Sequence, residues 1–489
     1  MILTIDLGTT TLKAALFRTD GILCSTKHAT IGKPLQTHEI DPILWSKALT
    51  NVCNALGNLS LVKAVVISGN GPTLVPVLGE PESKEGVVFA KTGMARTWLD
   101  RRPVTEGAEI SEVLGTFVDA GFFLPKALYL FHNERQTYEK SRWLLSSHEY
   151  LDYLLTGVAK AIIHSDDSQQ WYWTESLVTK LGMDKDKFPP FCNPGELIGT
   201  VTALASNTLT LPVGIPVFAG APDFYVSILG TGTVEVGQVC NRAGTSEGIN
   251  LCTRKPLADP RLMTYHHPVT PFYNVSGIIS TSGKAIEWAQ NLVGSRDVSF
   301  SDLYATMAEA EPGCGGVVFL PYLSGERAPI WDPEARAVFS GLNLDTGKRE
   351  LLRSVAEGTC FAMRDVITVM EELGSEVGQL RITGGPSESD FMNQLKADIT
   401  GREVLIPAMQ DAELVGCLII ALKALGYVTS YTEASHAVVK TKHLFMPEPK
   451  LQKVYDELFA TYRSLKEGHI PKKEQANAIR THLTQTGNL

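Results

Sequence analysis

The first seventeen residues, MILTIDLGTTTLKAALF, place a carboxylate beside a run of hydroxyl groups and a lysine. Alternating apolar residues predict a strand that ends at Asp6 and a returning strand at residues 12–17, joined by a hairpin turn. Backbone N–H groups of this turn, with Thr9, Thr10 and Lys13, could hold phosphate oxygens, and Asp6 could hold a magnesium ion. An ordinary hairpin that binds no ligand fits the same pattern. Residues elsewhere in the chain are therefore needed to distinguish it from a phosphate-binding hairpin.

A second hairpin of the same kind opens the second half of the chain. Val239 to Arg242 and Ile249 to Cys252 are predicted strands, and the turn between them contains Gly244 and Thr245. Two units that each begin with a Gly/Thr hairpin indicate an internal repeat. If both turns bind phosphate, two such units facing each other would place two phosphate loops across one cleft.

Three apolar strands are each followed by polar or glycine residues. Asn70 and Gly71 follow the first strand, Asp223 follows the second, and Gly384 and Gly385 follow the third. Open α/β sheets bind ligands at the carboxyl ends of their strands, and a pair of glycines allows a flat ring or a phosphate to approach the backbone. Plain turns would produce the same local pattern.

Trp98, Asp100, Arg101 and Arg102 form a cluster of aromatic and charged side chains. On a protein surface such a cluster is a solvated face with an ion pair. In a cleft it could bind a polyol, because carboxylate and guanidinium groups hydrogen-bond to hydroxyls and the ring of Trp98 can pack on sugar C–H groups. The local sequence leaves both interpretations open.

The bulk composition limits the class of protein. A chain of 489 residues is expected to form at least two domains, and a formal net charge of −9 argues against a nucleic-acid or anionic-membrane surface. The eight cysteines lack metal-site spacing and indicate free thiols in a reducing compartment. No leader pattern is present and no apolar run approaches the ~18 residues of a membrane span. We therefore expect a soluble, cytoplasmic protein with a small polar substrate.

The elements around these residues alternate between strands and helices. Apolar periodicity predicts helices at 41–56, in two parts of 121–157, and at 351–373, 391–400 and 413–425. The polar stretch beyond His443 is predicted to be helical and peripheral. The pattern favours α/β domains.

Four longer segments carry a resemblance to a known family. They are FLPKALYLFHNER (123–135), FLPYLSGERAPIWDPEARAVFSGL (319–342), LRSVAEGTCFAMRDV (352–366) and GGPSESDFMNQLKADITG (384–401). With them the chain resembles the FGGY carbohydrate kinase family, and within it the xylulokinase-like branch. The resemblance implies two ribonuclease H-like domains of the actin/Hsp70/sugar-kinase ATPase superfamily, facing a central cleft. It divides the chain into a sugar-binding domain at 1–235, an ATP-binding domain at 236–445 and a peripheral helical tail at 446–489.

The resemblance also implies roles for single residues. Asp223 matches the catalytic base that accepts the proton of the attacking sugar hydroxyl, and Asp6 matches the residue that orients Mg²⁺ through water. The remaining matches are the two phosphate loops (Thr9, Thr10, Lys13, Gly244, Thr245), the adenine and ribose wall (Gly384, Gly385, Asn393) and the sugar-binding WxDxR element (Trp98, Asp100, Arg102). ATP and Mg²⁺ are the implied cofactors.

Three positions depart from the family pattern. Asn70-Gly71-Pro72-Thr73 stands where D-xylulose kinases have Gln-Met-His-Gly, and Phe224 stands where the family has Asn beside the base. Asn70, Gly71, Asp223 and Phe224 are expected to contact the acceptor, and the hydrogen-bonding groups lost at 70–73 and 224 should change specificity strongly. Glu247 replaces a glycine beside the second phosphate loop, where an acid repels phosphate unless it points away or binds magnesium.

The leading hypothesis is an ATP-dependent kinase for a ketopentose such as xylulose, or for a related polyol or sugar acid. One rival is a catalytically inactive kinase fold that acts as a sugar or nucleotide sensor, and another is an Hsp70- or actin-like ATPase with a protein partner. Retention of Asp6, Asp223 and both phosphate loops favours the kinase over the sensor. The WxDxR and ERAPIWDP segments favour it over the second rival. The chain could also form a homodimer.

Overall fold

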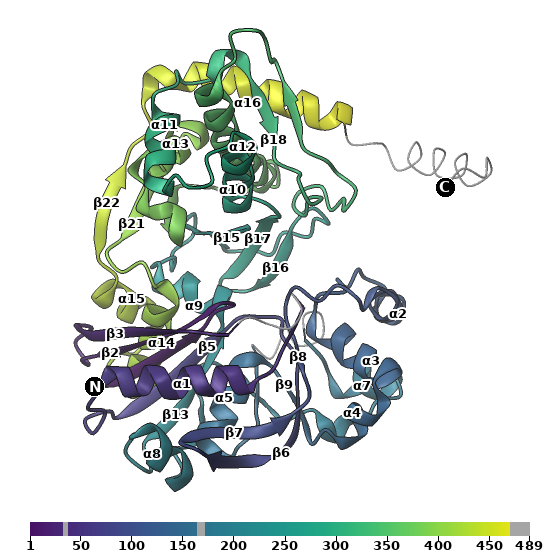
Figure 1. Cartoon of the computed structure of the whole chain (residues 1–489), viewed down its shortest axis with the longest axis vertical. Helices are drawn as coiled ribbons and strands as arrows, with labels where there is room; N and C mark the ends of the chain where they lie inside the picture. Colours follow the sequence, from purple (N-terminus) through teal and green to yellow (C-terminus); the bar gives the residue numbers. More distant parts are fainter. Residues whose placement is uncertain (33–37, 164–171, 470–489) are drawn as a thin grey trace, which may run out of the picture. The chain divides into compact units, whose positions relative to one another are not determined.

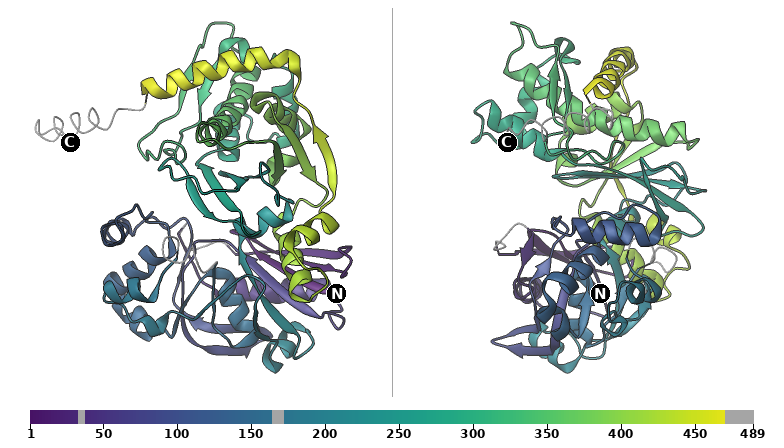
Figure 2. Two further views of the ribbon diagram at one scale, coloured as in Figure 1. Left: turned by 180° about the vertical axis from the view of Figure 1, so that it is seen from behind. Right: turned by 90° about the vertical axis from the view of Figure 1, so that its right-hand side faces the viewer.

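The structure, a computed structural model, describes residues 1–32, 38–163 and 172–469. These residues form two units, which can be followed in Figure 1 and from two further sides in Figure 2. The first unit comprises Met1–Val234, His266–Pro271 and Asp411–Lys440. The second comprises Glu235–Tyr265, Phe272–Gln410 and the described residues from Thr441 onward.

The first unit is built on a six-stranded sheet in the order β12-β13-β5-β1-β2-β3. Strand β1 pairs antiparallel with β2 and parallel with β5, and β5 pairs parallel with β13. The strands are β1 (Ile2–Leu7), β2 (Thr11–Phe17), β3 (Leu23–Thr30), β5 (Ala64–Gly69), β12 (Leu197–Thr200) and β13 (Pro216–Pro222).

The second unit repeats this arrangement in a seven-stranded sheet, β16-β17-β15-β14-β20-β21-β22. Here β14 pairs antiparallel with β15 and parallel with β20, which pairs parallel with β21. The strands are β14 (Val239–Ala243), β15 (Glu247–Thr253), β16 (Met263–His266), β17 (Tyr273–Ile279), β20 (Gln379–Thr383), β21 (Glu403–Pro407) and β22 (Thr441–Phe445). All six strands of the first sheet have counterparts of the same order and direction in the second sheet, so the predicted internal repeat and the α/β class are confirmed.

Helices cover both faces of the first sheet, and smaller strands surround it. The helices are α1 (Ile43–Leu56), α2 (Val104–Leu114), α3 (Phe123–Asn133), α4 (Arg135–Lys140), α5 (Ser147–Thr156), α7 (Glu175–Lys180), α8 (Ala203–Leu209), α9 (Asp223–Gly230), α14 (Ala412–Ala424) and α15 (Tyr431–Val438). The smaller strands are β4 (Glu39–Ile40), β6 (Val75–Lys84), β7 (Val87–Thr92), β8 (Ala95–Arg96), β9 (Trp143–Leu145), β10 (Ala161–Ile162) and β11 (Phe191–Cys192). Strand β9 lies within the stretch that was predicted as helix only.

Successive residues of β1 point to opposite faces of the sheet. Leu3, Ile5 and Leu7 pack in one hydrophobic cluster with residues of α1 and α5. The alternate residues, including Asp6, face the other side, where α14 contacts β1, β2 and β5. Residues 411–440 therefore fold with the first unit, whereas the sequence analysis had placed them in the 236–445 domain.

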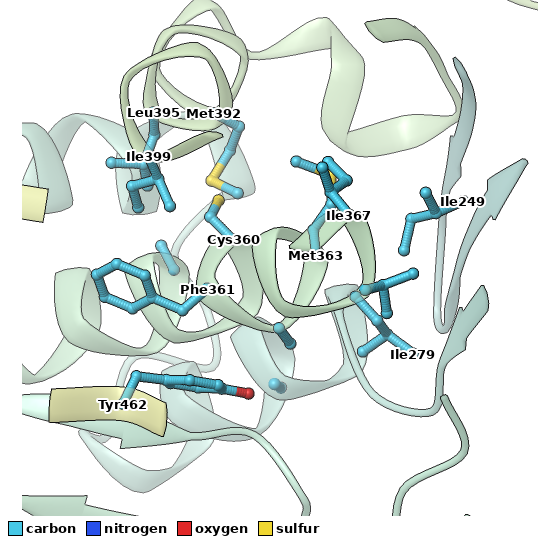
Figure 3. Packing of buried hydrophobic residues seen from close by; sticks show 14 of the residues in the cluster. Ile249, Ile279, Cys360, Phe361, Met363, Ile367, Met392, Leu395, Ile399 and Tyr462 are labelled. Carbon is cyan, nitrogen blue, oxygen red and sulfur yellow. The ribbon is translucent and has the colours of Figure 1, made fainter. Parts of the chain in front are cut away.

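The core of the second unit forms around α12, which lies between the sheet and the outer helices (Figure 3). Ile249 and Ile279 of the sheet approach it from one side, and Met392, Leu395 and Ile399 of α13 approach from another. The elements outside the sheet are α10 (Gly283–Leu292), α11 (Phe300–Ala308), α12 (Lys348–Glu372), α13 (Asp390–Thr400), α16 (Pro449–His469), β18 (Val318–Leu320) and β19 (Val338–Ser340).

Helix α16 corrects the expectation of a peripheral tail at 446–489. Its described part is helical as predicted, but Tyr455, Phe459 and Tyr462 are buried and pack around Phe361 of α12. Aromatic residues four and three positions apart bury one stripe of the helix in the core of the second unit. The sequence from 449 to 469 is therefore integral to this unit.

None of the helices in the described ranges is long and apolar enough to cross a membrane. All eight cysteines fall within those ranges, and each is a free thiol. Free thiols agree with the expectation from the cysteine spacing.

Helix α5 buries two acids that differ in their surroundings. Glu149 accepts hydrogen bonds from the backbone N–H groups of Ser146 and Ile162, both at 2.7 Å. Asp152 is 1% exposed, and neither of its carboxylate oxygens has a hydrogen-bond partner among the described residues. Burial, with the nearby charge of Glu149, raises the pKa of Asp152 well above its ordinary value. Asp152 therefore releases its proton less readily in the folded chain than in the unfolded chain.

We predict that Asp152→Asn stabilises the protein at neutral pH by about 1–2 kcal/mol, because it removes an unpaired buried acid. The raised pKa means that wild-type stability falls as the pH rises above the ordinary value of 3.8. The gain in the variant should therefore be larger at pH 8 than at pH 5 in urea unfolding. Asp20→Asn, at an exposed acid of the same unit, is the control. An equal gain at both pH values would contradict the prediction.

Candidate active site

The turn of the first hairpin directs its carbonyl groups into the protein. The side-chain amide of Asn70 donates to the carbonyls of Leu7 at 3.0 Å and Gly8 at 2.9 Å. The backbone N–H of Ile31 donates to the carbonyl of Thr10 at 2.8 Å. Because the C=O and N–H of one planar peptide point in opposite directions, the N–H that follows the bound carbonyl of Gly8 points away from Asn70.

The turn of the second hairpin is oriented in the same way by different donors. The backbone N–H groups of Gly283 and Ser282, at the start of α10, donate to the carbonyls of Gly244 at 2.9 Å and Thr245 at 3.1 Å. The carbonyl of Ser246 accepts from the N–H of Gly244 at 2.9 Å. The N–H groups of Thr245 and Ser246 therefore point away from these donors, as an anion site requires. Ser246 was not predicted, although aligning the two hairpin turns would have indicated it.

Asp6 and Lys13 face each other across the first hairpin on the face that α14 covers. Asp6 is 5% exposed and accepts a hydrogen bond from the hydroxyl of Ser68 at 2.7 Å. The ammonium group of Lys13 pairs with Asp411, a partner that no local sequence signal indicated. Burial opposes the charge of Lys13, but the hydrogen bond and charge of Asp411, with Glu413 and Asp6 farther away, raise its pKa. Lys13 is therefore cationic.

Asp223 lies at the first residue of α9, directly after β13. Strand β13 approaches β5 so closely that a Cβ atom on Gly220 would lie 1.8 Å from the carbonyl oxygen of Ile67. The pairing register of β13 shifts between Phe218 and Ala221, where this approach occurs. Asp223 accepts a hydrogen bond from the backbone N–H of Phe224 at 2.7 Å, and both side chains are partly exposed.

The WxDxR element contacts the first hairpin. The indole N–H of Trp98 donates to the hydroxyl of Thr9 at 3.0 Å. Asp100 is fully buried, and its two oxygens accept from Nε and Nη2 of Arg102 at 2.8 and 2.7 Å. Burial opposes ionisation, but these hydrogen bonds lower the pKa of Asp100. Arg102 also pairs with Glu39 at 2.8 Å, so its guanidinium group joins two carboxylates.

The segment after β5 is held from several sides. Asn70 is 4% exposed, and its Oδ1 accepts from the hydroxyl of Thr73 at 2.8 Å. With both amide ends bound, Asn70 braces the hairpin, and its contact with substrate stays a prediction. A Cβ atom on Gly71 would lie 3.9 Å from Pro222, which places Gly71 next to the segment that carries Asp223.

Lys126, which was not singled out in the sequence, supports the same segment from α3. Its ammonium group donates to the carbonyls of Pro72 and Gly121, each at 2.6 Å. The side chain is fully buried, and burial lowers its pKa to about 7. A neutral amine still has the two N–H donors that these carbonyls require.

The glycine pair of the second unit follows β20 closely. Gly384 has φ +92°, and a Cβ atom there would lie 1.9 Å from the carbonyl oxygen of Ala243, so only glycine fits. Gly385 begins a 3-10 turn, Gly385–Glu388, that leads to α13. Asn393 is 1% exposed, and its Nδ2 donates to the carbonyl of Ser387 at 2.8 Å, while its Oδ1 has no hydrogen-bond partner among the residues that the structure describes. A buried acceptor without a partner suits a ligand that donates a hydrogen bond.

The sequence matches the FGGY family of carbohydrate kinases, the N-terminal domain over residues 1–230 and the C-terminal domain over 239–425. The xylulose kinase of Lactococcus lactis is 27% identical, with 95% of this chain and 96% of that protein covered. The gluconokinase of Bacillus subtilis is 22% identical, with coverages of 89% and 90%.

A solved structure gives the same picture of the fold. The ligand-bound xylulose kinase of Lactobacillus acidophilus superposes with a TM-score of 0.83 at 23% identity, covering 96% of this chain and 98% of that one. Together with the two family matches, this similarity confirms the expected two-domain sugar-kinase fold.

We predict that Lys126 makes stability rise with pH above neutrality. The unfolded chain keeps a proton on this lysine up to about 10.5, whereas the folded chain loses it near pH 7. This group alone should therefore add about 2 kcal/mol of unfolding free energy between pH 7 and pH 9. Urea unfolding of wild type and Lys126→Met at both pH values isolates the effect as the difference between the two slopes. Equal slopes in the two proteins would show that Lys126 keeps its proton in the folded state.

Proposed function

Because the chain belongs to the FGGY family of carbohydrate kinases, we propose that it transfers the γ-phosphoryl group of ATP to a hydroxyl group of a small sugar. The family makes it a phosphotransferase with an alcohol acceptor. We assign acceptor binding to residues 1–235 and ATP binding to 236–445, with 411–440 folding as part of the first unit. The orientation of the two hairpin turns is the observation that carries the proposal.

The turns supply the phosphate-binding groups. Their carbonyls are bound within each unit, so the N–H groups of Thr9, Thr245 and Ser246 are turned outward. The hydroxyls of Thr9, Thr10 and Thr245 and the cationic Lys13 add donors of the kind that phosphate oxygens accept. Gly384, Gly385 and Asn393 are assigned to the adenine and ribose. Two observations support this assignment. The backbone at Gly384 passes too close to Ala243 for a side chain, and the Oδ1 of Asn393 has no hydrogen-bond partner among the described residues.

Asp6 is assigned to Mg²⁺, bound through water. A carboxylate at a strand end beside the turn provides the oxygen ligands that this ion prefers, and Ser68 fixes its orientation. Magnesium would neutralise charge on the ATP phosphates. The residues present fit that role.

Asp223 is assigned as the base that accepts the proton of the sugar hydroxyl. Phosphoryl transfer has a loose transition state, so this carboxylate mainly positions the nucleophile. Its place at a strand end, with Gly71 next to the preceding residue, supports the assignment. Trp98 and Arg102 are assigned to the sugar, Asp100 orients Arg102, and Phe224 supplies an apolar edge.

The acceptor is proposed as a ketopentose such as xylulose, or a related polyol or sugar acid. Relatives at 22–27% identity include both xylulose kinases and gluconokinases, so likeness alone leaves this range. A buried Asn70 that braces the hairpin, with Phe224 beside the base, supports an acceptor site unlike that of D-xylulose kinases.

A coupled assay of ADP release over ketoses, polyols and aldonic acids tests the proposal. At least one sugar should accelerate ADP formation severalfold above the rate without an acceptor. ATP and sugar binding without turnover on any member would instead favour the inactive sensor. The same screen identifies the acceptor.

We predict that Asp223→Asn lowers kcat at least ~100-fold and leaves the affinity for ATP nearly unchanged, because the amide cannot accept the hydroxyl proton. Steady-state kinetics with the best acceptor, together with ATP titration, measures both quantities. Asp20→Asn, at an exposed acid of the same unit, should retain full activity. A near-normal rate in Asp223→Asn would remove this residue from the mechanism.

A further inference from the structure

The acid beside the second phosphate loop is turned into the protein. Glu247 follows Ser246 directly, yet it is only 1% exposed. One carboxylate oxygen pairs with the ammonium group of Lys396, and the other accepts from the hydroxyl of Ser282 at 2.6 Å. The repulsion of phosphate that the sequence suggested is therefore offset by a cation within the same unit.

Lys396 reaches this position from α13 and binds both strands of the hairpin. Its ammonium group contacts Glu247 at the start of β15 and donates to Oδ1 of Asn241 on β14 at 2.7 Å. Lys396 is 2% exposed, and Asn241 is fully buried. The lysine therefore joins the base of the hairpin to the helix that also carries Asn393.

Ser282 connects the pair to the turn itself. Its hydroxyl donates to Glu247, while its backbone N–H donates to the carbonyl of Thr245 at 3.1 Å. The next residue, Gly283, donates to the carbonyl of Gly244 at 2.9 Å. Glu247 therefore fixes Ser282, whose backbone N–H binds the carbonyl of Thr245. Because that carbonyl and the N–H of Ser246 belong to one planar peptide, the orientation of the Ser246 N–H is fixed as well.

We propose that Glu247 and Lys396 are positioning residues for phosphate binding, which act through Ser282 on the turn at 244–246. The inference rests on the proposed function, because it concerns how that turn holds ATP. The inference goes beyond the proposed function because it gives a role to Glu247, an acid that departs from the family pattern. A buried charge pair fixes one geometry, because either partner alone would be an uncompensated charge in the interior.

If the pair only stabilised the fold, its removal would weaken the binding of ATP and adenosine equally. A positioning role predicts a loss that is confined to the phosphate contacts. Helix α13 is anchored to the core by Met392, Leu395 and Ile399 whether or not the pair is present (Figure 3). The adenosine wall should therefore survive removal of the pair, and only the phosphate contacts should weaken. Ligands that differ in their phosphates separate the two roles.

The test uses the full-length protein and calorimetric titration with ATP, ADP and adenosine in the presence of magnesium. The double variant Glu247→Gln/Lys396→Met removes both charges and leaves neither buried alone. Ser282→Ala removes only the hydroxyl that joins the pair to the turn, and it keeps the test valid if the double variant does not fold. Lys466→Met/Asp365→Asn removes another ion pair of this unit, between α16 and α12, as the matched control.

The double variant should raise the Kd for ATP at least about tenfold and that for adenosine less than about twofold, with ADP between them. Ser282→Ala should raise the Kd for ATP about threefold and spare adenosine, and the control should change neither. Unchanged ATP affinity in both test variants, or equal losses for ATP and adenosine, would overturn the inference. Failure of the wild type to bind ATP would instead overturn the proposed function.

Discussion

The peptide groups of both hairpin turns are oriented by hydrogen bonds to their carbonyls. A turn binds anions through backbone N–H groups that converge on one point, and each unit orients these groups with its own donors. The first unit uses the side-chain amide of Asn70, and the second uses the backbone of Ser282 and Gly283 at the start of α10. The repeat therefore preserves the topology of the sheet while the supporting groups differ.

Acidic side chains close to these turns are balanced within their own unit. Glu247 pairs with Lys396, Asp100 with Arg102, and Asp411 with Lys13. Glu247 of β15 is joined to Lys396 of α13, and the loop residue Asp411 to Lys13 of β2, whereas Asp100 and Arg102 lie in one loop. Buried charges are costly unless they are paired, so a single substitution in the Glu247–Lys396 pair should disturb both stability and ligand binding.

Local sequence patterns predicted the elements of secondary structure that depend mainly on neighbouring residues. The two hairpins, the strands that end at Asp223 and Gly384, and α12 followed from apolar periodicity and glycine positions. Long-range packing determined the rest: α16 enters the core through Tyr455 and Tyr462, and residues 411–440 join the first unit. The bracing role of Asn70 and the inward turn of Glu247 depend on partners 60 or more positions away, which no local pattern reveals.

A crystal structure with magnesium and a non-hydrolysable ATP analogue would show whether the turns bind phosphate through their backbone N–H groups. Phosphate oxygens should lie within about 3.2 Å of the backbone nitrogens of Thr245 and Ser246, and of Thr9 in the first hairpin. The carbonyls of Gly8, Gly244 and Thr245 should keep their present donors. Phosphates bound by side chains alone, or turns whose peptides have flipped toward the ligand, would contradict the account.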